Sequence, residues 1–334
     1  MNKSFIPVFF CADNNYAIPA YIALYSLLQN YKGNLRVKAF VLVSKDFSAK
    51  FKRLLKKLSD RYDFFEITII SAPDIYDSVS INCAHVSTAT LYRLLIPRIL
   101  NEIDSSIEKC IYLDSDIVVE GDIAELYDVD IEGYYIGGVR DRALSCDEMI
   151  GIEGYKKICK KLGIPTLNNY INAGVLLMNL KEIKEKRIDG KLENTGYRND
   201  FPYNDQDVIN TVCYSKIKTL PLKFNAMTTC LNHNGRYFYE QYGRENILEA
   251  LQNPVILHYI LKRKPWSCSN LLMAENWWKY VKMQDAEIMQ EYIQPFLLAQ
   301  KVSVHDWVRE AAKKATIKMG VYNLVRDAYY YLKS

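Results

Sequence analysis

Several features that would assign a chain to a familiar class of protein are missing from this sequence of 334 residues. No run of about 18 apolar residues occurs, so we expect no membrane-spanning helix. There is no long basic block, and a net charge of only +4 does not favour nucleic acid as a partner. The eight cysteines form no Cys-x-x-Cys pair, which indicates reduced and mostly buried thiols in a cytoplasmic protein.

Targeting signals and repeats are also missing. Residues 1–4 lead directly into a short apolar run without a cleavage site, so we expect no signal peptide. The sequence contains no internal repeat and no low-complexity segment. It is 49% hydrophobic and 25% charged, which is typical of a globular protein. We predict an α/β domain over residues 1–270 and a helical C-terminal extension over 271–334.

Short apolar runs alternate with helical patterns along the first half of the chain, which predicts an α/β fold. We expect strands at 5–11, 37–43, 65–71 and 109–114, and helices at 18–31, 46–60 and 87–100, the last of them ending at Pro97. We expect further strands at 135–141, 170–180, 217–222 and 254–260, a helical region with a loop near 199–204 at 181–212, and irregular structure at 224–250. Strands this apolar favour a mostly parallel sheet covered by helices on both faces, with ligands at the carboxyl ends of its strands.

Two carboxylates stand between two apolar runs in the stretch Asp114-Ser115-Asp116. Both side chains would share one face of an extended strand, so both could contact a single ion. Carboxylate oxygens are ligands that Mg²⁺ and Mn²⁺ prefer. The Asp-x-Asp pattern occurs again at 128–130 and 205–207 and is therefore a weak signal alone. The position after a buried strand is what favours a metal site here.

The first expected strand ends in polar residues that allow two interpretations. Asp13 and Asn15 could cap the helix that follows. They could also bind the imide edge of a pyrimidine base, with Tyr16 stacked on that base. The residues leave both interpretations open.

Other candidate residues also have a simple structural interpretation. Arg93 lies in an apolar helix and could be a surface side chain whose stem packs on the protein. Gly174 could permit close approach to a ligand, or only a β-bulge. Asp205 stands where a helix should begin and could be its cap. His258 ends a strand, and the basic residues 262–264 could form a solvated turn or a diphosphate site.

Taken together, these segments resemble glycosyltransferase family 8, which includes bacterial lipopolysaccharide galactosyl- and glucosyltransferases and glycogenin. In order, they are CADNNYA (11–17), HVSTATLYRLL (85–95), YLDSDIVV (112–119), YINAGVLLMNL (170–180), YNDQDVIN (203–210) and HYILKRKPW (258–266). The resemblance spans about residues 5–268. It implies a GT-A fold that binds a UDP-sugar, either UDP-glucose or UDP-galactose, together with Mn²⁺ or Mg²⁺.

The resemblance also implies roles for individual residues. The metal ion would be held by Asp114, Asp116 and His258. The UDP-sugar would be bound by Cys11, Ala12, Asp13, Asn15 and Tyr16 around the uridine, by Lys264 at the diphosphate, and by Arg93, Ser115, Asn172 and Ala173. The catalytic residues would be Gln206, Asp205 and Asp141.

The family retains the configuration of the anomeric carbon of the donor sugar. A double displacement would need a carboxylate nucleophile, but the family pattern places Gln206 there, and an amide is a poor nucleophile. We therefore favour a front-face substitution in which the departing phosphate takes the proton of the acceptor hydroxyl. One departure from the pattern is Leu261, which replaces the usual glycine, so the phosphate-binding loop could follow a different path.

Two other functions stay open at this point. A sugar-1-phosphate nucleotidyltransferase also combines an α/β sheet with a metal bound by aspartate. Such enzymes usually carry a Gly-rich loop and a basic residue after the first strand, and residues 11–17 contain neither. An inactive UDP-sugar-binding protein is the other alternative, but it would not need Asp114, Asp116, His258 and Gln206 together.

The C-terminal segment 302–334 carries an apolar face at helical spacing, with Trp307 and Tyr331 beside it and more basic than acidic residues. This face could pack on the protein itself or form a dimer. Our hypothesis is that it binds the inner face of the cytoplasmic membrane, where anionic lipids attract Lys and Arg. The acceptor would then be a lipid-linked glycan or oligosaccharide used in cell-surface polysaccharide synthesis.

Overall fold

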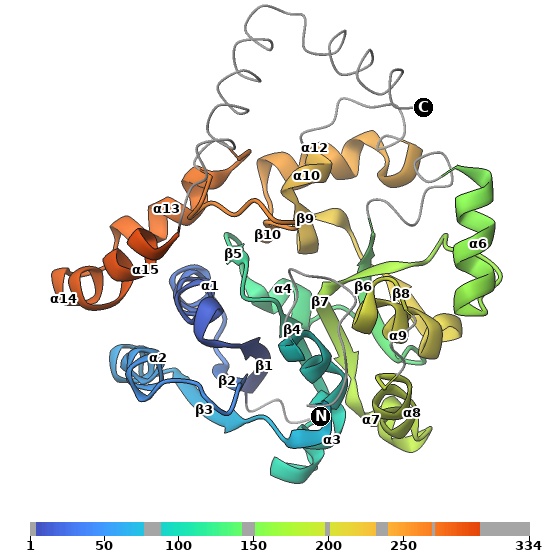
Figure 1. Cartoon of the computed structure of the whole chain (residues 1–334), viewed down its shortest axis with the longest axis horizontal. Helices are drawn as coiled ribbons and strands as arrows, with labels where there is room; N and C mark the ends of the chain where they lie inside the picture. Colours follow the sequence, from blue (N-terminus) through green and yellow to red (C-terminus); the bar gives the residue numbers. More distant parts are fainter. Residues whose placement is uncertain are drawn as a thin grey trace, which may run out of the picture.

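The computed structural model describes residues 5–76, 88–141, 151–197, 201–231, 240–268 and 271–300. At its centre is a seven-stranded sheet in the order β3-β2-β1-β4-β7-β6-β8 (Figure 1). The strands of this sheet are β1 (Phe5–Ala12), β2 (Arg36–Val43), β3 (Phe65–Ser71), β4 (Lys109–Leu113), β6 (Ile136–Arg140), β7 (Ile171–Asn179) and β8 (Ile217–Thr219). The predicted α/β fold with a mostly parallel sheet is confirmed.

Strand β7 runs against its neighbours, and this reversal positions the site. Strands β1 and β4 are parallel, whereas β7 is antiparallel to both β4 and β6. The register pairs Leu113, the last residue of β4, with Val175 in the middle of β7, so the first half of β7 extends beyond the end of β4. The beginning of β7 therefore lies at the same edge of the sheet as the carboxyl ends of β1 and β4. Side chains before and within the start of β7 can meet those that follow β4.

A second sheet of three short strands, in the order β5-β10-β9, stands next to that edge. It consists of β5 (Ile117–Val119), β9 (Ala226–Met227) and β10 (Ile256–His258). In the antiparallel register of β5 and β10, His258 is the partner of Ile117. The histidine is thereby brought next to Asp116, although the two residues are far apart in the sequence.

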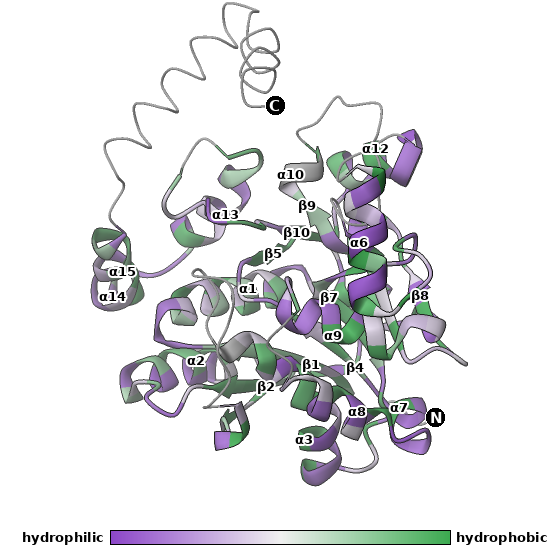
Figure 2. Cartoon of the chain, turned by 45° about the vertical axis from the view of Figure 1, so that its right-hand side comes forward, coloured by the Kyte–Doolittle hydropathy of each residue, from purple (hydrophilic) through white to green (hydrophobic). Residues whose placement is uncertain are grey.

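Helices cover both faces of the seven-stranded sheet, and two hydrophobic cores result (Figure 1). Alternate residues of β1 divide between them: Val8 and Phe10 belong to one core and Phe9 to the other. Figure 2 shows the strands as mostly hydrophobic beneath helices that carry both colours. The α-helices up to residue 231 are α1 (Ala17–Asn30), α2 (Ala49–Arg61), α3 (Ile96–Ile103), α4 (Ile123–Tyr127), α6 (Ile152–Leu162), α7 (Leu180–Glu185), α8 (Ile188–Thr195), α9 (Asn204–Val212) and α10 (Thr228–Leu231).

Some predicted elements differ from the structure. Residues 88–95 form a 3-10 helix, η3 (Thr88–Leu95), and Pro97 lies in the first turn of α3 instead of ending a helix. Proline is tolerated there because the first backbone N–H groups of a helix have no intrahelical partner. The predicted irregular region 224–250 contains β9, α10 and most of α12 (Arg244–Gln252). A two-residue strand is too short to show a period in the sequence. Other short turns are η1 (Asn14–Tyr16), η2 (Asp74–Tyr76), η4 (Tyr214–Lys216) and η5 (Leu222–Asn225).

Between residues 271 and 300 the chain forms α13 (Ala274–Lys282), α14 (Ala286–Ile288), a π-helical turn η6 (Met289–Ile293) and α15 (Gln294–Ala299). Trp277 and Tyr280 of α13 are buried in the same core as α1. The apolar face predicted at 302–334 lies outside the described residues, so its role and the division at residue 270 stay predictions. Within the described ranges, the structure has no helix that combines the length and the apolar character needed to span a bilayer.

Candidate functional site

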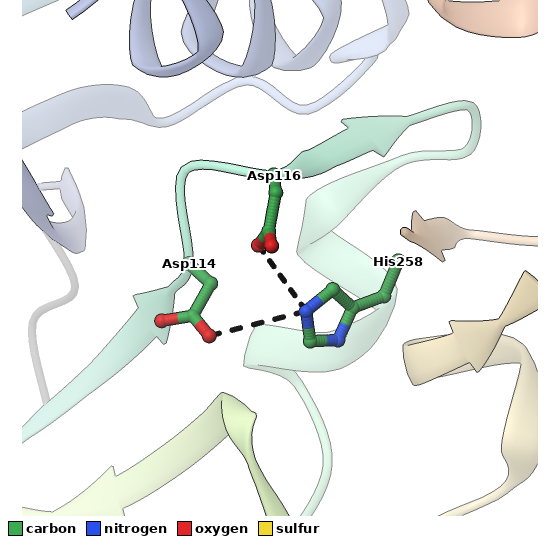
Figure 3. Close-up of side chains that lie close together, drawn as sticks. All are labelled: Asp114, Asp116 and His258. Carbon is green, nitrogen blue, oxygen red and sulfur yellow. Dashed lines mark ion pairs between the residues drawn. The ribbon is translucent and has the colours of Figure 1, made fainter. Parts of the chain in front are cut away.

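Asp114, Asp116 and His258 meet where β4, β5 and β10 come together (Figure 3). One ligand atom from each residue lies within 4.8 Å of those of the other two. The Nε2 atom of His258 is 3.2 Å from Asp116 Oδ1 and 3.9 Å from Asp114 Oδ2. The sequence predicted the two carboxylates as a pair, and the structure brings the predicted histidine to them.

Backbone hydrogen bonds hold these three residues in place. The N–H of Asp114 donates to the carbonyl of Gly174 at 2.8 Å, which extends the pairing of β4 and β7 by one residue. The N–H of Tyr259 donates to the carbonyl of Asp116 at 3.0 Å and continues the pairing of β5 and β10. Because both ladders continue into the site, its geometry follows from the two sheets.

Lys264 lies against the same carboxylates. Its Nζ forms an ion pair with Asp116 Oδ2 and donates to the carbonyl of Tyr259 at 2.6 Å. Burial alone would raise the pKa of Asp116, but attraction by Lys264, and less by His258, holds that pKa well below its usual range. Asp116 is therefore a half-buried carboxylate that is held ionised.

Arg93 connects this group to a third carboxylate. Its guanidinium is 3.0 Å from Asp114 and 2.9 Å from Asp205, and it donates to the carbonyl of Ala173 at 2.6 Å. Burial raises the pKa of Asp205, and the attraction of Arg93 offsets only part of this effect. We call Asp114, Asp116, Asp205, Arg93 and Lys264 the carboxylate cluster. With all three carboxylates ionised, the two cations leave one negative charge in the cluster.

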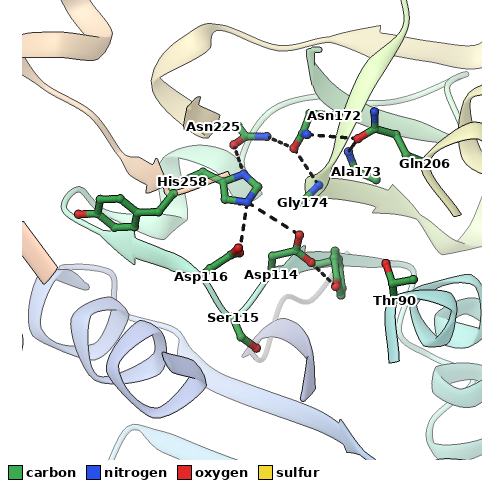
Figure 4. Close-up of polar contacts among 12 residues, drawn as sticks. Thr90, Asp114, Ser115, Asp116, Asn172, Ala173, Gly174, Gln206, Asn225 and His258 are labelled. Atoms are coloured by element: carbon green, nitrogen blue, oxygen red, sulfur yellow. Dashed lines mark hydrogen bonds and ion pairs between the residues drawn. The ribbon is translucent and has the colours of Figure 1, made fainter. Parts of the chain in front are cut away.

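A row of three amide side chains leads away from His258, as Figure 4 shows. Asn225 Oδ1 is 2.9 Å from His258 Nδ1, and Asn225 Nδ2 donates to Asn172 Oδ1 at 3.0 Å. Asn172 Nδ2 donates to Gln206 Oε1 at 3.2 Å, and Gln206 Nε2 donates to Asp141 Oδ2 at 3.3 Å. We call Asn225, Asn172 and Gln206 the amide chain. It joins the predicted metal ligand to two predicted catalytic residues.

Gly174 is the residue around which the two groups pack. A Cβ atom at this position would lie 2.8 Å from Asp114 Oδ2 and 3.0 Å from Nδ1 of His258, and it would overlap the imidazole ring. The pairing of β4 with β7 is regular up to Val175, whereas the pairing of β6 with β7 shifts register between Leu176 and Ile171, the stretch that contains Gly174. Both interpretations of this glycine therefore apply, and the group that approaches it closely is a histidine side chain of the protein itself.

A cavity of about 170 Å³ opens beside the carboxylate cluster. It is lined by residues from η3, β4, β7 and the start of α9: Thr90, Arg93, Asp114, Asn172, Ala173, Gly174, Pro202, Tyr203, Asn204, Asp205 and Gln206. Six predicted site residues are in this lining, and Asp141 reaches it through its hydrogen bonds with Asn172 and Gln206. The remaining predicted residues lie toward Lys264 and the end of β1.

At the end of β1, Asp13 caps the short helix η1. Its Oδ1 accepts hydrogen bonds from the N–H groups of Asn15 and Tyr16 at 2.9 and 3.0 Å. Ser115 Oγ donates to the carbonyl of Cys11 at 2.9 Å, which ties the carboxylate cluster to β1. Ala12 and Cys11 are buried and Asn15 is exposed. Burial and the nearby charges of Asp116 and Asp114 raise the pKa of Tyr16.

Two of the simple structural interpretations from the sequence are wrong. Arg93 is not a surface side chain, because it is buried between two carboxylates. Asp205 does not cap α9, which begins after Tyr203 and has no side-chain cap. The ion pair between Arg93 and Asp205 holds both side chains inside the site. Since the two residues belong to different elements, no local sequence pattern predicts this ion pair.

Sequence analysis missed Thr90 and Asn225. The hydroxyl of Thr90 donates to Asp205 Oδ1 at 2.7 Å and accepts from Arg93 at 3.0 Å. Its position one helical turn before Arg93 could have marked it as a candidate. Asn225 lies at the end of η5, within the region predicted to be irregular, and no pattern distinguishes it from other asparagines.

Leu261 adopts the left-handed backbone conformation with φ of +69°, and 66% of its surface is exposed. This conformation is unfavourable for a leucine and readily adopted by glycine. The residue therefore keeps the conformation that a glycine at this position would favour, at the cost of local strain. The path of the predicted phosphate-binding loop relative to other proteins stays a prediction.

Comparison with known proteins connects this site to a family. The model described as Glycosyl transferase family 8 matches residues 7–269. General stress protein A of Bacillus subtilis (strain 168) is 26% identical over 266 residues, which cover 77% of this chain and 86% of that protein. Lipopolysaccharide 1,2-glucosyltransferase of Escherichia coli is 26% identical over 261 residues, which cover 76% and 71%. A structure of the galactosyltransferase LgtC with donor and acceptor sugar analogs has a TM-score of 0.66 at 22% identity, covering 85% of this chain and 99% of that one.

Proposed function

The chain belongs to glycosyl transferase family 8 and has the predicted GT-A fold, and from that premise we propose that it is a retaining, metal-dependent hexosyltransferase. The reaction would move glucose or galactose from UDP to a glycan acceptor. The observation that carries this proposal is the group of Asp114, Asp116 and His258 within 4.8 Å of one another, next to the cavity that Gln206 lines.

The donor atoms of this group fit a divalent cation. Two carboxylate oxygens suit Mn²⁺ and Mg²⁺, and the imidazole nitrogen favours the transition metal of the two. The carboxylate cluster also carries one more negative than positive charge when its carboxylates are ionised, which a cation would offset. When bound, such an ion would supply positive charge to the diphosphate leaving group.

Lys264 would act on the same leaving group. Its ammonium contacts Asp116 in this structure, and in the complex it would bind an oxygen of the diphosphate. Departure of UDP builds negative charge on the β-phosphate, and a fixed ammonium stabilises that charge as it develops. Arg93 would keep Asp114 and Asp205 in position during this step, since it holds both through its guanidinium.

Gln206 is poorly suited to act as a nucleophile. Its Oε1 accepts from the N–H of Ala173 at 3.1 Å and from Asn172 at 3.2 Å, so both lone pairs are engaged. This supports the front-face substitution. The acceptor oxygen forms its bond to the anomeric carbon on the side where the bond to the phosphate oxygen breaks. The departing phosphate takes the hydroxyl proton, while Gln206 and Asp205 position the sugar.

UDP release tests the reaction. With the full chain, UDP-glucose or UDP-galactose should release UDP when Mn²⁺ is added, and EDTA should abolish the release. We expect Asp116→Asn to lower the rate about 1,000-fold, since a lost metal site removes about 4 kcal/mol of transition-state stabilisation. Asp130→Asn is the matched control, because Asp130 belongs to another Asp-x-Asp, is exposed, and its carboxylate accepts the N–H of Glu132 in a turn.

The outcomes separate the candidate functions. Undiminished release by Asp116→Asn, or release that persists in EDTA, would end the metal-dependent mechanism. Tight donor binding without any release would favour an inactive UDP-sugar-binding protein. Formation of UDP-sugar from a sugar-1-phosphate and UTP would favour a nucleotidyltransferase.

We propose that Asp13, Asn15 and Tyr16 bind the uracil base of the donor. The second oxygen of Asp13 is available beside the one that caps η1, and Tyr16 stands edge-on to Trp266 with ring centroids 6.1 Å apart. An edge-on neighbour leaves a face of Tyr16 for stacking. Calorimetry should show UDP binding more tightly than GDP, and equal affinities would mean that this pocket is misassigned.

The acceptor is proposed to be an oligosaccharide or a lipid-linked glycan, in line with the lipopolysaccharide 1,2-glucosyltransferase among the relatives. We propose that the segment 302–334 holds the enzyme on the inner face of the cytoplasmic membrane, from its basic and apolar pattern alone. The full chain should sediment with anionic liposomes at low salt, and a chain ending near residue 300 should not. Equal sedimentation of the two would contradict this role.

A further inference from the structure

The predicted metal ligand His258 has a buried partner behind it. Its side chain is 3% exposed, and its Nδ1 is 2.9 Å from Oδ1 of Asn225, which is completely buried. The other ring nitrogen, Nε2, faces Asp114 and Asp116 (Figure 4). Each nitrogen of this imidazole therefore has a distinct neighbour.

The orientation of the Asn225 amide follows from backbone donors. The N–H of Gly174 donates to Asn172 Oδ1 at 3.0 Å, which identifies this atom as the oxygen. The atom of Asn225 that is 3.0 Å from the same oxygen must then be its nitrogen, because two oxygens would repel each other. The atom that faces His258 is consequently the Asn225 oxygen, which can only accept.

The opposite end of the amide chain gives the same assignment. The N–H of Ala173 donates to Gln206 Oε1, so that atom is an oxygen, and the Asn172 atom beside it is a nitrogen. Two neighbouring peptide groups of β7 thus orient all three amides. With Asn225 accepting, Nδ1 of His258 must carry a proton, and Nε2, which faces the carboxylates, is the nitrogen left to bind a metal ion.

We propose that Asn225 is a positioning residue that selects the Nδ1–H tautomer of His258 and thereby prepares Nε2 to bind the metal ion. This proposal rests on the proposed function, since it assigns His258 as a ligand. A metal-bound histidine depends on the hydrogen bond at its other nitrogen for tautomer and ring orientation, and loss of such a partner typically weakens metal binding 10- to 100-fold. Asn225 would act through His258 and would not touch the substrate.

The experiment compares variants of the full chain without donor sugar. Free Mn²⁺ measured by electron paramagnetic resonance gives the dissociation constant, and ¹⁵N-histidine NMR in EDTA gives the tautomer of His258. The chain has four histidines, and the spectrum of a His258→Gln variant assigns the signal. Neither readout depends on catalytic activity.

Asn225→Ala should weaken Mn²⁺ binding by about 10- to 100-fold and shift His258 away from the Nδ1–H form. Asn225→Asp loses the donor to Asn172 Oδ1 but keeps an acceptor for Nδ1–H, so it should retain the tautomer and bind Mn²⁺ more tightly than Asn225→Ala. Asn30→Ala is the control, because Asn30 donates to Ser26, Val119 and Tyr280 and its loss should lower stability without changing Mn²⁺ affinity.

Three results would overturn the proposal: His258 of the unaltered chain in the Nε2–H form, unchanged Mn²⁺ affinity in a folded Asn225→Ala, or equal loss of affinity in Asn30→Ala. The first result is measured on the unaltered chain, so the proposal can be tested even if the Asn225→Ala variant does not fold. The Asp116→Ala variant distinguishes a failure of this proposal from a failure of the proposed function. If that variant also binds Mn²⁺ normally, the metal site of the proposed function is wrong; if it alone loses Mn²⁺, only the role of Asn225 is wrong.

Discussion

The carboxylate cluster and the amide chain meet at Gly174, and they are stabilised in opposite ways. In the carboxylate cluster, three acidic side chains face two cations, and burial works against every ionised group. In the amide chain, neutral donors and acceptors match one another and two backbone N–H groups of β7. The first group has charge available for an incoming cation, whereas the second is already satisfied and can serve as a rigid frame.

The two aspartates at the extremes of the carboxylate cluster show how much a local cation matters. Burial raises the pKa of both. For Asp116, Lys264 and His258 reverse the effect and hold the pKa below its usual range. For Asp205, Arg93 is shared with Asp114 and the pKa stays raised. The pKa of Asp116 is thus lowered by a cation that it does not share, whereas the shared Arg93 does not offset the effect of burial on the pKa of Asp205.

Of the predicted changes, the removal of Arg93 should lower the stability of the carboxylate cluster most. Arg93→Met leaves the buried Asp205 and the half-buried Asp114 without their shared cation, and we expect the free energy of unfolding to fall by about 3–5 kcal/mol. Urea unfolding without metal measures this. Arg98→Met is the matched control, since Arg98 also pairs with two carboxylates, Glu102 and Glu193, but is partly exposed. Its loss should cost about 1 kcal/mol or less, and equal costs would mean that burial is not decisive.

A methyl group at Gly174 should disturb both groups at once. Gly174→Ala would push against His258 and Asp114, and we expect a loss of about 1–3 kcal/mol in unfolding free energy together with weaker Mn²⁺ binding. Gly137→Ala in β6 is the control, because its Cβ would meet Ile131 and Leu220 at an ordinary 3.4 Å. If both variants behave alike in thermal unfolding and Mn²⁺ titration, Gly174 has no special role.

Acid should weaken the carboxylate cluster and leave the amide chain unaffected. A carboxyl whose pKa is lower in the folded than in the unfolded chain stabilises the fold above its unfolded pKa of about 3.9, and this contribution is lost as pH falls toward the folded value. For Asp116 the pKa is lowered. Between about pH 5 and pH 3, the unfolding free energy of the metal-free chain should therefore fall more than that of the Asp116→Asn variant. Parallel pH profiles of the two proteins in urea would contradict this sign.

The smallest effect is expected at Leu261, in the segment that runs from His258 to Lys264. Leu261→Gly relieves the left-handed strain but adds entropy to the unfolded chain, so we expect a net gain of up to about 1 kcal/mol. Leu248→Gly in α12 is the opposite case, because glycine in a helix costs about 1 kcal/mol. Thermal unfolding of both variants checks the signs, and a destabilised Leu261→Gly would show that the exposed side chain contributes contacts.

The sequence predicted the family, the α/β class and most central strands, because continuous apolar runs and ordered motifs are local in the chain. The predicted strands at 5–11 and 65–71 correspond closely to β1 (Phe5–Ala12) and β3 (Phe65–Ser71). Local patterns failed where the partner is distant. Asp205 looked like a cap because nothing near it in sequence shows Arg93. Pro97 looked like a helix end because a proline within a helical pattern usually interrupts the helix, and the local pattern does not show that a new helix begins there.

By itself, the sequence determined which side chains are available: two carboxylates after a buried strand, a histidine at the end of another, and an arginine within an apolar segment. Only the tertiary structure decided that β7 is reversed, that β10 pairs with β5, and that Asn225 stands behind His258. The reason is physical. Burial and the spacing of hydrophobic residues can be recognised from residues that are neighbours in the sequence. The hydrogen bonds and ion pairs of the site, in contrast, join residues up to 148 positions apart, as between Asp116 and Lys264.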